Sequence, residues 1–358
     1  MQKKLIVLAL AGLVAAPVFA QSQVTIYGIV DMGVSYRSDN LARGIGSKTA
    51  IDSGIGNGSR LGFRGVEDLG GGLKAGFVLE QGLFADRGIH AQGGRSYGRQ
   101  SYLSLSGGFG GLRLGRMYTQ QNTLMGTFDP FEDGFVGRAA NIYEQSYFGR
   151  TDNTIMYTTP SLGGFTVTGA YSTQIAGQEN RDNDGDIRMW SIAPRYTNGP
   201  LDVMVNYHRA KAHGVDGAKA NKVWDLAAAY NFGVVRLSAM YGQNKDGWAT
   251  DRSYGMVGGY EWDKARFWMV GLTAPIGSAG KLMASYNRAK VDVNSSNTDK
   301  ASQWAVGYSH NLSKRTDLYA VYADINNKGN SSWGTSTDAT NGSDGYQRGL
   351  NLGVRHRF

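Results

Sequence analysis

The sequence has 358 residues with 52 glycines, 20 tyrosines, 6 prolines and no cysteine, and its formal net charge is +8. A chain without cysteine has no disulfide framework, and its basic residues are interleaved with acids rather than clustered as in a nucleic-acid-binding patch. The glycine and tyrosine content, with turn signals throughout, favours an all-β chain.

The first twenty residues are expected to form a signal peptide and not to belong to the fold. Lys3 and Lys4 precede an apolar run at residues 5–14, and a small-residue cleavage pattern ends at Ala20. Such a run is too short for a membrane-spanning helix, which needs about 20 residues. We therefore expect export, cleavage after Ala20 and a mature β-domain over residues 21–358.

Segments of alternating apolar and polar residues fill the rest of the chain. In the last of them, Leu350, Leu352 and Val354 alternate with Asn351 and Gly353. Successive side chains of a strand point to opposite faces, and a tilted strand needs about 9–11 residues to cross a membrane. Strands are predicted at residues 24–36, 58–67, 73–84, 98–106, 112–118, 152–159, 164–173, 188–196, 201–209, 223–232, 234–243, 266–274, 280–290, 302–311, 316–325 and 348–358.

Short and long connections alternate between these sixteen segments. Residues 68–72 and 107–111 are typical short turns, whereas residues 174–187 and 326–347 are long and polar. Short turns on one rim, long loops on the other and aromatic residues near many segment ends are typical of an antiparallel transmembrane β-barrel. Residues 252–262 alternate only weakly, and we place them in a long loop as an extension of a strand.

Several short motifs follow one another in a set order. They are VTIYG at 24–28, SRLGFRG at 59–65, LRLGR at 112–116, DNTIMY at 152–157 and NLSKRT at 311–316, with a terminal Phe358. Together they resemble the trimeric general porins of Gram-negative outer membranes, in the branch of Neisseria-like and Burkholderia-like bacteria. The resemblance covers the mature chain and implies a sixteen-stranded barrel that forms a homotrimer. It also implies contacts with outer-membrane lipid and lipopolysaccharide, and passive diffusion of small hydrophilic solutes and ions.

The resemblance further implies that the third long loop, residues 117–150, folds inward and narrows the pore. Its acidic tip would face basic residues of the wall, and the resulting field would select solutes by size and charge. The acids are Asp129, Glu132 and Asp133; the basic residues are Arg60, Arg64, Arg99 and Arg138, while Lys74 and Glu80 share the inward parity of their strand. Arg99 shares the parity of the lipid-facing Leu103 and Leu105, unless the inward loop covers that face. Because the bases outnumber the acids, we expect a mild preference for anions.

No catalytic site is expected. The five histidines lie on separate segments, and none has a nucleophile at a suggestive spacing. Residues 182–186 resemble a calcium loop but lack its terminal glutamate, so neither a metal nor a cofactor is expected. The alternatives to a general porin are a solute-specific channel, a secreted adhesin or structural β protein and, least favoured, an outer-membrane hydrolase. Folding in buffer without detergent would indicate the secreted protein.

Overall fold

The computed structural model describes residues 23–40, 46–143, 148–180, 182, 185–250, 257–293, 297–329, 331, 333–335 and 345–358. The predicted signal peptide lies outside the described residues, and so do residues 183 and 184 of the calcium-like turn. No helix of the described part is both long and apolar enough to cross a membrane.

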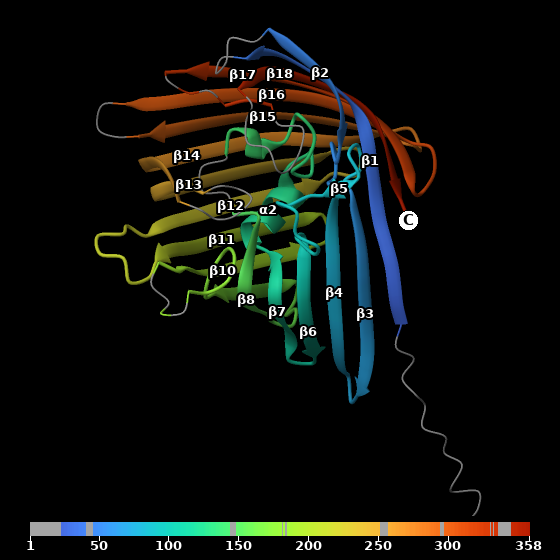
Figure 1. Cartoon of the computed structure of the whole chain (residues 1–358). Helices are drawn as coiled ribbons and strands as arrows, with labels where there is room; N and C mark the ends of the chain where they lie inside the picture. The colour runs from blue at the N-terminus through green and yellow to red at the C-terminus, as the bar shows by residue number, and fades with distance from the viewer. Residues whose placement is uncertain are drawn as a thin grey trace, which may run out of the picture.

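Sixteen long antiparallel strands close into a barrel (Figure 1). They are β1 (Gln23–Asn40), β3 (Arg60–Gly70), β4 (Leu73–Phe84), β6 (Gln100–Gly107), β7 (Gly110–Tyr118), β8 (Arg150–Thr158), β9 (Phe165–Ser172), β10 (Ile187–Asn198), β11 (Leu201–Ala212), β12 (Asn221–Asn231), β13 (Arg236–Thr250), β14 (Val257–Ile276), β15 (Gly280–Asp292), β16 (Thr298–Asn311), β17 (Thr316–Lys328) and β18 (Tyr346–Arg357). Two further strands, β2 (Ser47–Ser53) and β5 (Ile89–His90), are short additions near the long-loop rim. The predicted barrel of sixteen strands is therefore confirmed.

Strand β1 closes the barrel because it pairs with both of its neighbours in turn. Residues 23–29 of β1 pair with β3, and residues 29–40 pair with β18. The main-chain N–H of Gly28 donates to the carbonyl oxygen of Phe358 at 3.1 Å, so both ends of the barrel chain meet at the rim of short turns. Strand β14 begins at Val257, which confirms the predicted strand extension from that residue on.

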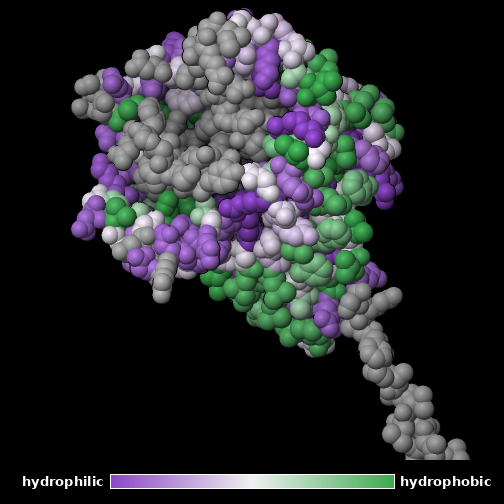
Figure 2. Space-filling model, in the orientation of Figure 1, coloured by the Kyte–Doolittle hydropathy of each residue, from purple (hydrophilic) through white to green (hydrophobic). Residues whose placement is uncertain are grey.

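The two faces of the wall have opposite character. Outward positions carry exposed aliphatic side chains, such as Ile26 and Leu103, each 61% exposed. The alternate, inward positions bury polar groups, including Asn206, Gln303 and Asn351. Figure 2 shows hydrophobic residues over the wall around β3 and β4 and hydrophilic residues along the rim that carries the long loops. A soluble sandwich would bury its apolar face, so this wall fits lipid outside and water inside.

Aromatic side chains lie in pairs along part of the outer wall, near the long loops. Their ring centroids lie 5.2–5.5 Å apart, and the pairs are Trp190–Tyr207, Trp224–Tyr241, Trp268–Tyr286 and Trp304–Tyr322. They join β10 to β11, β12 to β13, β14 to β15 and β16 to β17. Tryptophan and tyrosine favour the boundary between hydrocarbon and headgroups. We call these eight residues the aromatic girdle.

The segment between β7 and β8, described at residues 119–143 and 148–149 and here called the inner loop, folds into the barrel (Figure 1). The loop begins with helix α2 (Gln120–Phe128), whose N-cap Thr119 accepts from the N–H of Asn122, and it contains a short 3₁₀ helix, η1 (Ala139–Asn141). An inward third loop was predicted, whereas helix α2 was not.

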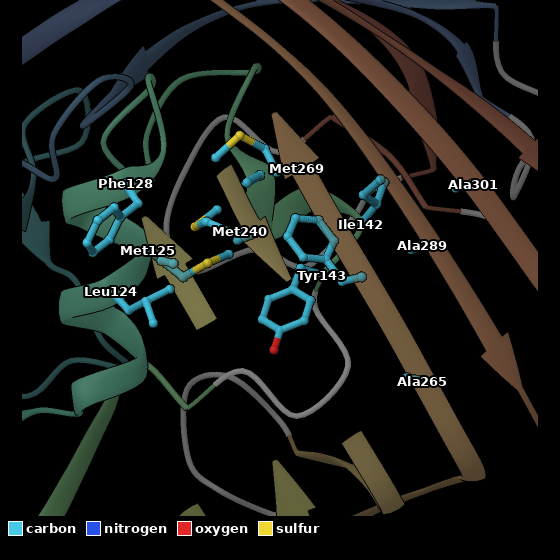
Figure 3. Close-up of a cluster of buried hydrophobic side chains, with 14 of the residues drawn as sticks. Leu124, Met125, Phe128, Ile142, Tyr143, Met240, Ala265, Met269, Ala289 and Ala301 are labelled. Atoms are coloured by element: carbon cyan, nitrogen blue, oxygen red, sulfur yellow. The ribbon is translucent and has the colours of Figure 1, made fainter. Parts of the chain in front are cut away.

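The inner loop is fixed to one side of the wall by its apolar residues. Leu124, Met125 and Phe128 of α2 are almost fully buried and belong to the same cluster as Met240 and Met269 of the wall (Figure 3). Further along the loop, Phe131 and Val136 pack in a second cluster formed with β15, β16 and β17. Each fully buried side chain of this size contributes about 1.5–3 kcal/mol. The loop is therefore a packed part of the barrel interior.

Candidate pore constriction

Three arginines meet on the wall formed by β3, β4, β7 and β8. The Arg99 Nε donates to the Glu80 Oε1 at 2.8 Å, and the Arg60 Nη1 lies 4.0 Å from the same oxygen. Arg99 and Arg150 also donate to the Tyr118 hydroxyl, at 2.5 and 3.0 Å. Three guanidinium groups thus surround one carboxylate and one phenol. We call these five residues the arginine wall; their net charge is positive.

The arginine wall contains two residues that the sequence analysis missed. Tyr118 and Arg150 are direct cross-strand partners, but the register shifts between Gly115 and Met117, where a bulge interrupts the β7–β8 ladder. Counting alternate residues across such a bulge assigns the wrong face. Arg150 also lies two residues before the predicted start of its strand. Its place next to the long inner loop was the only available signal.

The position of Arg99 has a simple explanation. Its strand β6 begins one residue later, at Gln100, and the N–H of Arg99 donates to the carbonyl oxygen of Glu80 at 3.1 Å. Arg99 therefore lies before the regular ladder, and the alternation that makes Leu103 and Leu105 lipid-facing does not apply to it. Its side chain is only 4% exposed, since Glu80 and Tyr118 surround it.

The remaining wall bases lie away from this cluster. Arg64 is exposed on β3, and its guanidinium carbon lies 5.1 Å from the centre of the Tyr27 ring. Lys74 pairs with Asp68 and Ser106 at the short-turn rim. It is six residues from Glu80, which corresponds to about 20 Å along the strand. Lys74 therefore lies at the mouth of the pore and not at the height of the arginine wall.

Glu132 is the exposed acid of the inner loop. Its carboxylate accepts from the Lys281 Nζ at 2.7 Å. Burial alone would raise its pKa, but Lys281, with Arg355 and Arg357 nearby, holds the pKa of Glu132 below its ordinary value. Ile29 of β1 is the direct partner of Arg60 on one side and of Arg357 on the other. Arg357 is therefore two strands away from Arg60, which corresponds to about 10 Å around the barrel wall. Glu132 therefore lies near the β18 side of the arginine wall.

Asp129 does not lie where we expected it. We expected a water-facing acid, but its side chain is only 2% exposed. Its two oxygens accept from the N–H groups of Phe131 at 3.0 Å and Ala139 at 2.8 Å. Burial raises the pKa of Asp129 to about 7. Asp129 thus joins two turns of the inner loop, while Asp133, whose carboxylate lies 3.4 Å from the Asn122 amide nitrogen, is half-buried.

Arg138 also differs from the expectation. We expected it on the basic wall, yet it is 5% exposed and lies within the inner loop, against the wall strand β16. Its Nε donates to the Asn141 side chain at 3.2 Å, and its carbonyl oxygen accepts from Gln303 of β16 at 3.1 Å. The loop needs these contacts because its turns leave backbone groups without ladder partners. Arg138 therefore holds the loop to the wall.

The far end of the loop has a polar anchor. The Tyr143 hydroxyl donates to Asp225 of β12, and Asn206 of β11 donates to the same carboxylate at 2.8 Å. Burial, followed by the negative charge of Asp225, raises the pKa of Tyr143 well above its ordinary value. Tyr143 thus remains neutral and keeps its proton for this hydrogen bond.

A closed barrel with an apolar outer wall, a polar interior and a packed inner loop is a membrane channel of the porin class. Within the described part of the chain, no group of three histidines or acids could hold a metal ion. The family model for the Gram-negative porin matches residues 6–330, and the chain belongs to this family.

Comparison with known proteins agrees with this assignment. An outer membrane porin protein of Bordetella pertussis is 33% identical over 405 residues, which cover all of both chains. The solved structure of an anion-selective porin from Comamonas acidovorans is 34% identical, with a TM-score of 0.78 over 94% of this chain and 100% of that one. OmpT of Vibrio cholerae in a trimer form shares the fold alone, at 15% identity and a TM-score of 0.71 over 94% of this chain and 99% of that one. The protein is a passive diffusion channel of the Gram-negative outer membrane, and its fold is that of a channel rather than an enzyme.

Proposed function

We propose that this channel prefers anions and that its narrowest level lies between the inner loop and the arginine wall. The observation that carries this proposal is the positive charge of the arginine wall, where Arg60 and Arg99 lie beside the single carboxylate of Glu80. Arg150 joins them through the hydroxyl of Tyr118. On the loop side, the exposed Glu132 is paired with Lys281. The anion-selective porin from Comamonas acidovorans, which is 34% identical, supports the same preference.

The physical basis is electrostatic. Hydrated anions entering a narrow, positively lined level are attracted by wall charges, and cations are repelled. Salt screens exposed charges within about 10 Å at 0.1 M, so the preference should be strongest in dilute salt. Glu132 and Asp133 reduce the positive potential from the opposite side and, with the arginines, orient dipolar solutes across the pore. Small hydrophilic solutes keep their hydration in such a field, whereas apolar ones must displace ordered water.

The experiment is a reversal-potential measurement in planar bilayers with a potassium chloride gradient. Arg60→Gln with Arg150→Gln should shift selectivity toward cations, and Glu132→Gln with Asp133→Asn should shift it toward anions. Lys314→Gln with Arg315→Gln, on an exposed short turn, is the matched control and should change nothing. Unchanged selectivity in both test variants would show that the constriction lies elsewhere.

We further propose that the channel is a homotrimer assembled through the wall of β1 and β3–β8. The four pairs of the aromatic girdle all lie on β10–β17, whereas this wall presents exposed Ile26, Leu103, Leu114 and Ile155. Since the girdle residues favour the lipid headgroup boundary, the wall that lacks these pairs is the one that we assign to contact with neighbouring barrels. Leu103 and Leu114 are cross-strand partners. Changing both to Arg should convert trimers into monomers in light scattering of detergent solutions; a trimer of unchanged mass would contradict this interface.

A further inference from the structure

The loop between β11 and β12 forms one side of a cavity at the mouth of the barrel. The cavity has a volume of about 550 Å³, which is within the range of sites that hold small organic molecules. Ile187 of β10, Ala212 of β11 and Val293, just after β15, line it from inward positions, because each lies two residues from a side chain that is buried in the barrel interior. The cavity therefore lies on the inner side of the wall, on other strands than the arginine wall.

An indole ring in a fixed position forms part of the cavity surface. Trp262 of β14 lines the cavity, is only 2% exposed and belongs to the hydrophobic cluster that also contains Ile142 and Tyr143 of the inner loop. The ring lies against Gly247, its direct partner on β13, where a Cβ atom would lie 2.0 Å from the ring. Only glycine leaves room for the indole here. The cavity thus has an aromatic surface that is in place before any ligand binds.

Three carboxylates line the same cavity. Asp216 belongs to the loop between β11 and β12, whereas Asp246 belongs to β13 and Asp263 to β14. Asp246 comes directly before Gly247, and Asp263 comes directly after the strand partner of this glycine, so the two acids stand opposite each other on antiparallel strands. Like charges in directly opposed positions destabilise a sheet. A cation bound between these two acids would relieve this repulsion.

The basic residues nearby compensate only part of this acidity. Lys222 lies 3.6 Å from the Asp246 carboxylate, and Lys219 is the one base among the described residues that line the cavity. Asp216 and Asp263 have no basic partner within 4 Å in the described part of the chain. The acids are not gathered around one point either, since no group of three acids or histidines among the described residues could hold a metal ion. The cavity is therefore suited to a larger cation than a metal ion.

We propose that this cavity binds an organic cation in which an ammonium group is attached to an aromatic or aliphatic body. The body packs against Trp262 and Val215, and a cation near the indole face gains a further attraction. The ammonium group faces Asp246 and Asp263 and offsets the repulsion between them. The site therefore requires a positive charge and an apolar body together. It adds a binding function to the channel and does not rest on the proposed anion preference.

The test measures the binding of phenylethylamine to the channel in phosphatidylcholine nanodiscs by isothermal titration calorimetry, with empty nanodiscs as background. Asp246→Asn with Asp263→Asn removes the opposed charges at constant size, and asparagine tolerates the positive φ of 52° at Asp246. Glu67→Gln with Asp68→Asn removes two exposed acids from the short-turn rim and is the matched control. An exposed ion pair contributes up to about fivefold in affinity, so the cavity variant should bind about twenty-five-fold more weakly. The control should bind as the wild type does.

Two further comparisons separate the charge of the ligand from its body. Phenylethanol, which has the same ring without the charge, should bind the wild type as weakly as phenylethylamine binds the cavity variant. Ala218→Trp fills the cavity, leaves its acids in place and should abolish binding of the amine. Equal affinities for amine and alcohol, equal affinities of the cavity and control variants, or amine binding that survives Ala218→Trp would overturn the proposal. Calorimetry involves no ion current, so reversal potentials test the anion preference separately.

Discussion

Asp129→Asn should make the inner loop insensitive to pH. In the wild type, the Asp129 carboxylate is 2% exposed and accepts from two loop N–H groups. Its pKa is about 7 in the folded loop against an ordinary value of 3.8. Because the folded value is the higher one, the closed loop binds the proton more tightly than the open loop does. The resulting stability is fully present below pH 3.8 and is lost as pH rises through about 7.

The size of the effect follows from these two values. Between pH 5.5 and pH 8, the ratio of closed to open loop should fall about thirty-fold, which corresponds to roughly 2 kcal/mol. Asparagine keeps one acceptor oxygen and carries no charge, so its closed state should be equally stable at both pH values. Alanine removes both acceptors and leaves two buried N–H groups unpaired, at a cost of about 1–3 kcal/mol each.

Hydrogen exchange of the main-chain N–H groups of Phe131 and Ala139 measures this opening directly. After correction for intrinsic rates, wild-type protection should be about thirty-fold greater at pH 5.5 than at pH 8. Glu132→Gln is the control, since the exposed Glu132 has a lowered pKa and is ionised across this range. It should retain the full pH dependence. Protection that does not change with pH in the wild type, or that changes equally in the Asn variant, would refute the reasoning.

Three further changes give separable outcomes. Tyr118→Phe removes the hydroxyl that two wall arginines share, and it should lower the free energy of unfolding by about 1–3 kcal/mol in urea titrations in micelles; an unchanged midpoint would contradict the shared hydrogen bond. Asp31→Ala leaves the N–H groups of Gly56 and Asn57 and the hydroxyl of Tyr319 without their buried acceptor, so roughly 3–6 kcal/mol should be lost; a loss below 1 kcal/mol in the same titration would be inconsistent with this role. Lys281→Gln breaks an exposed ion pair worth about 1 kcal/mol or less, so stability should hardly change, whereas the reversal potential should shift toward cations. A shift toward anions would show that the lysine does not offset the loop acid.

The strands could be predicted because each one satisfies two environments at once. Lipid on one side and water on the other impose a strict alternation, as at Leu350 to Val354, and the alternation survives in the sequence. The pairing of Arg60 with Gly82 and of Gly62 with Glu80 follows the predicted inward parity. The sequence therefore predicts which wall residues point inward and which point outward wherever the hydrogen-bond ladder is regular.

The site could be predicted only in part, because its key positions lie where the ladder is irregular. A bulge near Gly115 hides the inward direction of Tyr118 and Arg150, and Arg99 lies just outside its strand. Within the inner loop no alternation exists to read. The family resemblance and their position in the sequence marked Asp129 and Arg138 as pore residues, but the tertiary packing of the loop buries both. Burial in such a loop depends on contacts with strands that lie far away in the sequence.

The pairing of β1 with β18 determines when the barrel can be completed. The two strands are the first and the last of the wall, so their ladder cannot form until β18 is available. A chain interrupted before Tyr346 would retain two unpaired strand edges, which in the hydrocarbon or in water invite pairing with other chains. Pairing of β18 with β1 removes both edges at once, because it satisfies the free edge of each strand. The hydrogen bond from Gly28 to Phe358 belongs to the seam that forms in this step.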